Sequence, residues 1–396
     1  MEFRLQHHLG IEDLAAHLAV DPNGKRPSFR ICGSDVGDDP AKIALFRCNR
    51  AIRRRPPFRL HNPENLAWPI AQSLEKTIHT ASSYGIVADH IYCIGDRLFF
   101  FDDGRFFTDT SFYPNPGDIE RMLKKNNGRL YHVERNDGDW KIRPMVRKIL
   151  EIDEPTAFIG SAEPSNYGSY LFRILPKLMS LRNESDRKVC VLARSPWQLE
   201  LLALAGLDRS RIIPHKLIAI TRFKDVLLPS MRNRNCYVDD DSKAFYRKIA
   251  LSCKRSSLYP TKLFISRLNS DGSVRSKRAF LAETDLIERL SHFGYQAVRP
   301  ETFSLSEQVA LFAGATHIIG GSGSGMFNVL FADVGVTVID IESEPHWIGA
   351  HANLFASCGA HYAFAIGAPS EQDQRPAHRN WSLNIDDFIE AFKDVL

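Results

Sequence analysis

The sequence has none of the cysteine patterns that are typical of disulfide-stabilised or zinc-binding proteins. Its seven cysteines are scattered, odd in number and without a Cys-x-x-Cys pair. A disulfide framework needs an even set of cysteines, and a zinc module needs closely spaced pairs. Both classes are therefore excluded, and a reducing compartment is expected.

Long apolar runs are missing as well. No stretch reaches the about 18 uninterrupted apolar residues of a membrane span, and the opening residues Met-Glu-Phe-Arg-Leu-Gln-His-His lack the apolar segment of a signal peptide. We predict a cytoplasmic protein. The basic run 53–55 and the cations Arg143, Arg147 and Lys148 leave peripheral contact with an anionic membrane open, although solvated surface charge is the favoured interpretation.

Neither sign of charge dominates. Lysine and arginine number 51 against 47 acidic residues, and the net charge of +4 is too small to indicate a nucleic-acid-binding protein. With 44% hydrophobic and 25% charged residues, the chain has the composition of a folded globular protein. Its 396 residues predict two packed domains with additional segments.

The order of predicted elements divides the chain into three parts. Residues 1–150 are an accessory region, rich in breakers at first, whose aromatic strands at 91–94, 98–101 and 105–107 predict an antiparallel β meander. Core packing is favoured for these aromatics over a sugar-stacking platform. Residues 151–238 and 239–396 alternate buried strands with amphipathic helices, which predicts two doubly wound, Rossmann-like α/β units. Because ligands bind such sheets at the carboxyl ends of the strands, we expect the site in a cleft between facing units.

A glycine-rich turn in the last unit is a candidate phosphate site. The strand at 317–319 runs into Ser322, Gly323, Ser324 and Gly325, followed by an apolar helix at 326–331. Small residues let backbone amides approach an anion such as a diphosphate, and the helix dipole favours the negative charge. The motif is neither a dinucleotide fingerprint nor a Walker loop. A tight strand-to-helix turn without a ligand is an equal alternative.

Basic residues follow the first strand of the same unit. Arg267 stands directly after the strand at 262–266, and Arg275, Lys277 and Arg278 lie in the loop beyond it. A planar guanidinium suits a phosphate, so Arg267 is predicted to bind the diphosphate. The loop cations are open to simple solvation.

Polar residues also follow the first strand of the unit at 151–238. Glu163 is predicted to take a proton from an acceptor hydroxyl, with Asn166, Tyr167 and Ser169 beside it on the acceptor side. Helix capping by Ser165 or Asn166 is the plainer alternative.

Over about residues 155–345, the chain resembles glycosyltransferase family 61. The resemblance rests on the order and spacing of short motifs at 166–168, 175–178, 264–267, Arg278 with Glu283, 300–301, 305–308, Ala315, 318–320, Gly323 and 328–331. It implies a GT-B architecture and an inverting, metal-independent hexosyl or pentosyl transferase without a cofactor. The implied donor is a nucleotide sugar, expected to be UDP-linked, and the implied acceptor is a glycan or lipid-linked glycan. A bacterial setting in capsule or other surface polysaccharide synthesis fits best.

The resemblance also implies roles for single residues of the last unit. Arg267, Arg278 and the turn at 322–325 would hold the diphosphate, and Glu301 would contact ribose or base. Asn328 is expected to fix the turn from behind.

The sequence departs from the family at two places. Ser169 and Arg173 stand where members commonly have a histidine and an acidic residue, and Ser322 stands where many have a histidine in the glycine turn. Serine does not act as a base near neutral pH.

Another residue must then supply the catalytic base. The candidates are Glu163 and His346, with His215 and His351 as further alternatives. Two other functions stay open. One is a catalytically silent member that binds nucleotide sugars or a partner enzyme in a polysaccharide-assembly complex, and the other, ranked last, is a nucleotide-sugar epimerase.

Overall fold

The chain forms two compact units that share the N-terminal region. The computed structural model describes residues 3–5, 7–8, 29–31, 45–47, 51–65, 74, 77–79, 83–101, 104–108, 120, 123–124, 126–136, 139–145, 149–182, 184–233, 236–269, 273, 279–343, 345–370 and 380–396. Unit 1 comprises Met1–Asn49 and Ala81–Arg232, and unit 2 comprises Arg50–Thr80 and Asn233–Leu396. These limits differ from the sequence boundaries at 150 and 238, because segments of the first 150 residues join the sheets of both units.

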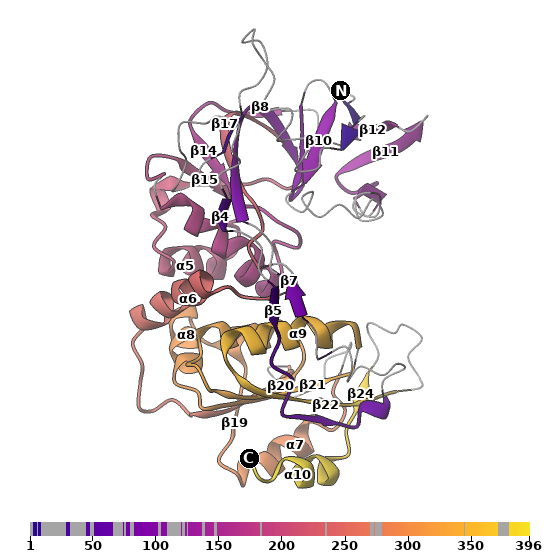
Figure 1. Ribbon diagram of the computed structural model, residues 1–396, viewed down its shortest axis with the longest axis vertical. Helices are drawn as coiled ribbons and strands as arrows, with labels where there is room; N and C mark the ends of the chain where they lie inside the picture. The colour runs from indigo at the N-terminus through magenta and orange to yellow at the C-terminus, as the bar shows by residue number, and fades with distance from the viewer. Residues whose placement is uncertain are drawn as a thin grey trace. The chain divides into compact units, whose positions relative to one another are not determined.

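Unit 2 is built on a fully parallel six-stranded sheet (Figure 1). Its strand order is β19 (Gln296–Val298), β18 (Lys262–Ile265), β20 (His317–Gly321), β21 (Thr337–Glu342), β22 (His361–Ile366) and β6 (Arg59–His61). Helices α8 (Leu305–Ala313) and α9 (Pro345–Cys358) cover one face, and α7 (Glu283–Ser291) and α10 (Ile385–Phe392) cover the other. The alternation of strands and helices in the sequence predicted this parallel α/β arrangement.

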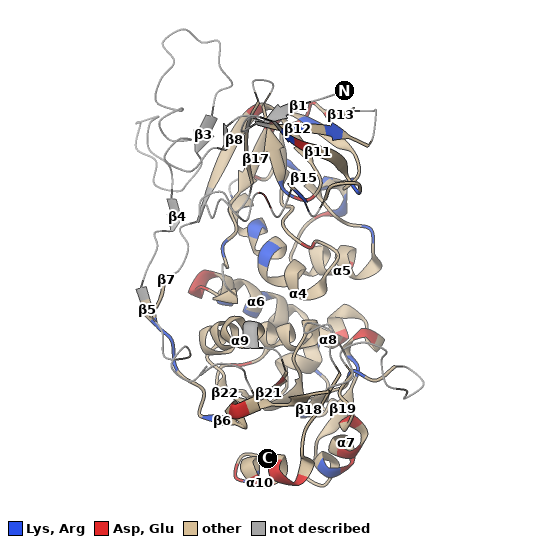
Figure 2. Ribbon diagram, turned by 90° about the vertical axis from the view of Figure 1, so that its right-hand side faces the viewer, with Lys and Arg blue, Asp and Glu red and all other residues tan. Residues whose placement is uncertain are grey.

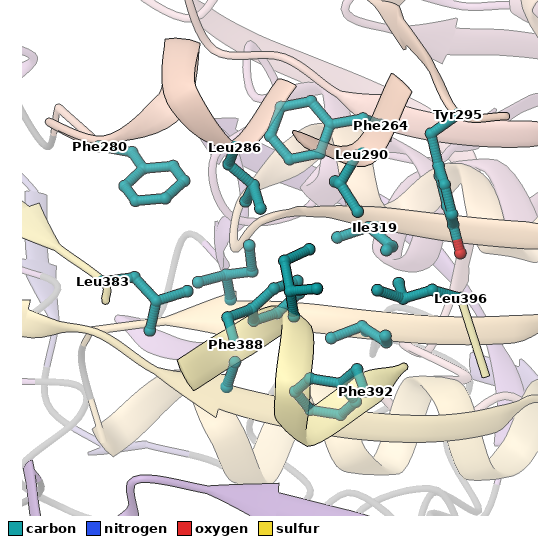
Figure 3. Close-up of a cluster of buried hydrophobic side chains, with 14 of the residues drawn as sticks. Phe264, Phe280, Leu286, Leu290, Tyr295, Ile319, Leu383, Phe388, Phe392 and Leu396 are labelled. Carbon is teal, nitrogen blue, oxygen red and sulfur yellow. The ribbon is translucent and has the colours of Figure 1, made fainter. Parts of the chain in front are cut away.

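The core of unit 2 lies between the sheet and the helices α7 and α10. Leu286 and Leu290 of α7, and Phe388 and Phe392 of α10, are spaced four residues apart and are buried on one side of each helix. They pack toward strand residues such as Phe264, as Figure 3 shows. Charged residues stand at exposed positions of both helices, among them Glu288 and Arg289 in α7 and Asp386 in α10. Figure 2 shows these charged segments of α7 and α10. This packing fixes the sheet whose carboxyl edge carries the glycine turn.

Unit 1 contains a mixed sheet. Strands β16 (Ile212–Pro214), β15 (Lys188–Val191), β14 (Thr156–Phe158) and β17 (Ile220–Pro229) are parallel, and β13 (Ile149–Ile152) also pairs with β17. Strand β17 pairs antiparallel with the long β8 (Ser83–Ile94), which continues antiparallel into β9 (Leu98–Phe100) and β10 (Arg105–Thr108). The aromatic strands expected from the sequence therefore extend the sheet of the first α/β unit.

The phenylalanines of these strands form a core. Phe99 stacks on Phe107 at a centroid distance of 5.2 Å and meets Phe158 of β14 edge-on at 5.3 Å. All three rings are at most 2% exposed. Core packing, the interpretation favoured from the sequence, is correct for these rings.

The segment at 167–181 changes its winding along its length. One α-helical turn, α4 (Tyr167–Ser169), passes into π-helical residues η2 (Tyr170–Ile174) and a 3-10 stretch η3 (Leu175–Leu181). Pro176 has no backbone N–H, so it interrupts α-helical bonding and accounts for the change to 3-10 winding. Helix α5 (Pro196–Leu204) is regular and begins with a capping box of Ser195 and Gln198.

The structure corrects one residue of the predicted basic surface. Arg54 is 5% exposed, and its guanidinium donates to the Leu74 carbonyl at 2.9 Å and to Asn353 Oδ1 at 2.6 Å, so it faces the interior of unit 2. Arg53 is exposed, whereas Arg147 and Lys148 lie outside the described residues. Among the described helices, none combines the length and the apolar composition that a bilayer crossing requires.

Candidate functional site

Two loops meet at the carboxyl edge of the unit 2 sheet. Strands β18 and β20 are adjacent and parallel, and Ile265 pairs with Gly320 at their ends. A side chain on Gly320 would lie 2.8 Å from Ile265 Cβ, so only glycine allows this close pairing. The pairing brings Arg267, two residues after Ile265, next to the glycine turn that begins at Gly321.

The Arg267 guanidinium is held against the turn. Its Nη1 donates to the backbone carbonyl of Ser322 at 2.7 Å. A Cβ on Gly321 would lie 3.0 Å from Arg267 Cδ, and one on Gly323 would lie 3.6 Å from Nη1. The missing side chain of Gly321 therefore makes room for the arginine, whereas a Cβ on Gly323 would only be in ordinary contact with it. The result is a cation fixed beside a strand-to-helix turn, as an anion site requires.

A buried glutamate organises the backbone that carries Arg267. Glu283, the first residue of α7, is 2% exposed, and its Oε1 accepts hydrogen bonds from Ser266 Oγ at 2.7 Å and from the Arg267 N–H at 2.6 Å. The Leu268 N–H donates to the same oxygen at 3.3 Å. A charged acceptor with several donors is strongly held, so Glu283 positions the loop after β18.

The turn itself is supported from within unit 2. The Ser322 N–H donates to the Ile341 carbonyl at 2.8 Å. After Gly323 the chain enters η7 (Ser324–Phe331), a 3-10 helix where an α-helix was expected at 326–331. The buried Asn328 donates through Nδ2 to the Gly325 carbonyl at 2.9 Å and accepts from Gln308 Nε2 at 2.8 Å. This is the supporting position expected for Asn328.

Behind the turn lies a buried group of titratable side chains. Ser322 is 3% exposed, and its Oγ lies 3.1 Å from Nδ1 of His351 in α9. The same Nδ1 lies 2.6 Å from Asp340 Oδ2 in β21. A Ser-His-Asp catalytic triad uses both ring nitrogens, whereas here serine and aspartate share one, so this geometry does not activate Ser322.

The same group contains the residues best suited to a metal ion. Ligand atoms of Asp340, Glu342 and His351, all buried, lie within 4.8 Å of one another. Carboxylate and imidazole groups are ligands of zinc and other divalent metals. The hydrogen bond between His351 and Asp340 already engages two of the three groups. The predicted absence of a metal site remains a prediction, and this cluster is the place to test it.

The remaining predicted donor residues are placed unequally. Glu301 is exposed on the 3-10 turn η6 (Pro300–Thr302) that follows β19. Ser324 and Gly325 are partly exposed at the start of η7. Arg278 lies outside the described residues. His346 lies in α9, and its side chain is outside the described part of the structure.

In unit 1, three residues that the sequence singled out meet at the carboxyl end of β14. Ser169 Oγ donates to Glu163 Oε2 at 3.3 Å, and Arg173 Nη1 lies 3.4 Å from the same oxygen. The Glu163 side chain is 50% exposed. Ser169 and Arg173 are two of the three residues at which the chain departs from the family pattern, and both contact the carboxylate of Glu163.

The backbone before this group is tightly constrained. Glu163 has a φ of 56°, a left-handed conformation that is uncommon for residues with a side chain. Three residues earlier, a Cβ on Gly160 would lie 2.4 Å from the Phe158 ring and 2.7 Å from the Asp96 carbonyl. The buried Lys177 donates to the Gly160 carbonyl at 2.6 Å. These contacts hold the segment that presents Glu163.

The neighbouring residues have structural contacts. Asn166 is the N-cap of α4, and its Oδ1 accepts from the Ser169 N–H at 2.9 Å. The capping alternative for Asn166 is thus correct. Tyr167 meets the Trp197 ring edge-on at a centroid distance of 5.6 Å.

His215 is unsuited to be the base. It is 3% exposed, and its Nε2 lies 2.5 Å from the Gly95 carbonyl. Burial lowers its pKa to about 4, although the contact with Gly95 opposes this shift. The ring is therefore a neutral core group near neutral pH, and its burial leaves it without access to an acceptor hydroxyl.

Sequence reasoning missed the supporting roles of Glu283, Asp340 and Lys177. Glu283 and Lys177 both stand in motifs that carry the family resemblance, which was the available signal. Nothing in the sequence around Asp340 links it to Ser322, because His351 joins them from a separate helix.

Comparison with known proteins adds one match. Residues 167–339 match the family model described as Glycosyltransferase 61. The matched range contains α4, Arg267, Glu283 and the whole glycine turn, and it ends in β21 just before Asp340. Among curated proteins, no sequence matches the chain.

Proposed function

Because this chain belongs to glycosyltransferase family 61, we propose that it transfers a hexose or pentose from a nucleotide sugar to a glycan or lipid-linked glycan. In this proposal the donor is UDP-linked, the anomeric configuration inverts, and no metal takes part. The proposed setting is the synthesis of a bacterial surface or capsular polysaccharide in an enzyme of GT-B architecture.

The observation that carries the proposal is the contact between Arg267 and the glycine turn. A guanidinium fixed 2.7 Å from the Ser322 carbonyl, at the carboxyl end of a parallel sheet, is suited to a diphosphate. Backbone amides around Gly323 and Ser324 add donors at the same edge. Unit 2 is therefore assigned the donor, with Glu301 beside the ribose or base.

The reaction is a direct displacement at the anomeric carbon. The acceptor oxygen forms a bond to this carbon while the bond from the carbon to the diphosphate oxygen breaks, and the nucleoside diphosphate departs. Arg267 stabilises the negative charge that develops on the leaving group. The proton of the acceptor hydroxyl passes to a base, so that every bond broken and every proton released is accounted for.

Glu163 is the proposed base. Its carboxylate is half exposed at the carboxyl end of β14 and lies in a segment held by Gly160 and Lys177. Ser169, within 3.3 Å, would orient the carboxylate. His346 remains the second proposed base.

The catalytically silent alternative also has an observation in its favour. Arg173 contacts the same Glu163 oxygen that would receive the proton, at 3.4 Å, and so competes with an acceptor hydroxyl for it. In this alternative unit 2 binds a nucleotide sugar without transfer. Product formation separates the two.

The test has two steps. Thermal shift against UDP, GDP, CMP, ADP and their sugar conjugates identifies the donor, because a ligand that binds only the folded state raises the Tm. NMR of the reaction with candidate acceptors then reports the configuration of the new anomeric bond. Binding with transfer and inversion is expected. Binding without transfer to any acceptor supports the silent alternative, and transfer with retention contradicts the proposed mechanism.

A further inference from the structure

The most exposed apolar side chains of the described residues gather in one region of unit 2. Leu258 is 90% exposed, Val334 is 82% exposed and Leu251 is 67% exposed, and no other large hydrophobic side chain in the described ranges exceeds 56%. Leu251 lies in the last turn of α6 (Asp240–Ser252), and Leu258 lies in the loop after this helix. Val334 lies between η7 and β21. Single exposed leucines are ordinary, but three together need a cause.

An ion-pair centre ties these three segments to one another. The Asp333 carboxylate pairs with the Arg247 guanidinium of α6 and lies 3.3 Å from Arg255 Nη2 in the following loop. Val334 is the next residue after Asp333, and Leu251 lies one helical turn after Arg247. Leu258 follows Arg255 by three residues. The three apolar side chains therefore belong to segments that meet at Asp333.

Basic side chains outnumber acidic ones in the same region, although α6 itself begins with the exposed Asp240 and Asp241. Residues 242–262 contain six lysines and arginines and no acidic residue. Lys248 and Lys254 are exposed, as are Arg247 and Arg255 around Asp333. Four cations and one carboxylate thus accompany three protruding apolar side chains.

From this combination we infer that the α6 basic patch, made of Arg247, Lys248, Leu251, Lys254, Arg255, Leu258 and Val334, binds the surface of an anionic phospholipid membrane. Apolar side chains flanked by lysine and arginine enter the boundary between headgroups and acyl chains, while the cations contact anionic headgroups. A protein interface is disfavoured by the same composition, since the core of such an interface is depleted of charge.

This membrane surface differs from the one that the sequence indicated. The run 53–55 contains the buried Arg54, and Arg143 lies 3.9 Å from Glu134. The α6 basic patch has three exposed apolar side chains, whereas Met145 is the exposed large apolar side chain described beside Arg143. The inference does not depend on the proposed transferase activity.

The experiment is flotation of the full chain with vesicles of phosphatidylcholine alone or with one quarter phosphatidylglycerol. We expect wild-type protein to bind the anionic vesicles at least about 10-fold more tightly than the neutral ones, and binding to fall several-fold between about 0.1 and 0.5 M salt as the charges are screened. The variant Leu251→Ser/Leu258→Ser/Val334→Ser and the variant Lys248→Glu/Lys254→Glu should each lose at least about 10-fold.

The matched control is Met145→Ser/Ile218→Ser, which removes two exposed apolar side chains from unit 1. It should bind anionic vesicles as the wild type does, and all variants should keep the wild-type circular dichroism and Tm. The inference is overturned if wild-type protein ignores anionic vesicles, or if the apolar triple variant binds them equally well. It is also overturned if the triple variant abolishes self-association in ultracentrifugation while vesicles have no effect on either protein.

Discussion

The carboxyl edges of the two sheets are built in opposite ways. In unit 2, Arg267, the glycine turn and Glu283 are joined by hydrogen bonds of 2.6 and 2.7 Å, and Glu283 is buried. In unit 1, the half-exposed Glu163 has contacts of 3.3 and 3.4 Å. An anion site gains from preorganised donors, whereas a base must leave its partners to meet a substrate hydroxyl. The difference agrees with the proposed roles, in which unit 2 binds the donor and unit 1 supplies the base.

The largest expected effect is that of a substitution at the exposed carboxyl edge of the unit 1 sheet. Glu163→Gln removes the proposed base, and we expect the single-turnover rate to fall by about 10²- to 10⁴-fold. Glu151→Gln is the matched control, because Glu151 is also exposed in unit 1 and lies 3.5 Å from an arginine, Arg222. Full turnover by Glu163→Gln would remove Glu163 from the mechanism and leave His346 as the base.

The second largest effect is expected from removing Arg267 at the hydrogen-bonded carboxyl edge of the unit 2 sheet. Arg267→Ala removes a charged donor, which is worth about 1.5–3 kcal/mol, so the Kd for the nucleotide should rise about 10- to 100-fold in calorimetry. Arg289→Ala, on the exposed side of α7, should leave the Kd unchanged. An unaltered Kd for Arg267→Ala would show that the donor site lies elsewhere.

The third prediction tests whether the buried Glu283 positions the loop that carries Arg267 in unit 2. Glu283→Ala leaves the donors of Ser266, Arg267 and Leu268 without their common acceptor, and we expect the free energy of unfolding to drop by about 1–3 kcal/mol. The nucleotide Kd should rise as well, because Arg267 loses its support. Urea unfolding and calorimetry measure the two effects.

Two further variants test this assignment. Glu283→Gln keeps an acceptor oxygen and should recover most of the nucleotide affinity. Glu307→Ala, which removes an exposed capping box, should lower stability by about 0.5–1 kcal/mol without altering the Kd. Glu283→Gln and Glu283→Ala with equal, unaltered Kd values would contradict a positioning role.

A fourth effect, similar in size to that of Glu283→Ala, is the pH dependence of the free energy of unfolding that His215 causes. The pKa of His215 is lowered to about 4 in the folded chain and is about 6.5 when unfolded. Between these values the unfolded chain binds a proton that the folded chain does not, so stability is full above about pH 6.5 and falls as the pH drops toward 4. At pH 5 the expected loss is about 2 kcal/mol. Urea unfolding of His215→Gln at pH 7 and pH 5 should lack this part of the pH dependence.

The smallest expected effect is that of metal removal. Transfer should continue at an unchanged rate in EDTA. Loss of activity that a divalent cation restores would contradict metal independence and would direct attention to Asp340, Glu342 and His351.

Much of unit 2 could be predicted from the sequence, because its signals are local. The strand predicted at 262–266 is β18 (Lys262–Ile265), and the strand predicted at 317–319 lies within β20 (His317–Gly321). Strand β6 (Arg59–His61) could not be foreseen, because it joins the sheet through pairing with β22 (His361–Ile366), about 300 residues away. Its inclusion explains why part of the N-terminal region belongs to unit 2.

The candidate site also has a part that local sequence predicts and a part that it does not. The glycines, Arg267 and Glu163 stand at the ends of predictable strands, where ligand-binding residues of α/β sheets are found. The partners of these residues come from other elements. Ser322 meets His351 from α9, and the backbone around Arg267 is bonded to Glu283 from α7.

The sequence by itself determined the parallel α/β character of unit 2, the glycine turn and the place of Arg267 at the end of a strand, because hydrophobic periodicity and glycine content act over a few residues. Only the tertiary structure decided which polar groups share a hydrogen bond and which stay in water. It turned Arg54 inward, made His215 a neutral core residue and placed Arg173 on Glu163. The first two outcomes depend on contacts between segments distant in the chain, and the third depends on how the chain winds between 163 and 173. No local pattern of the sequence encodes the burial and charge that decide them.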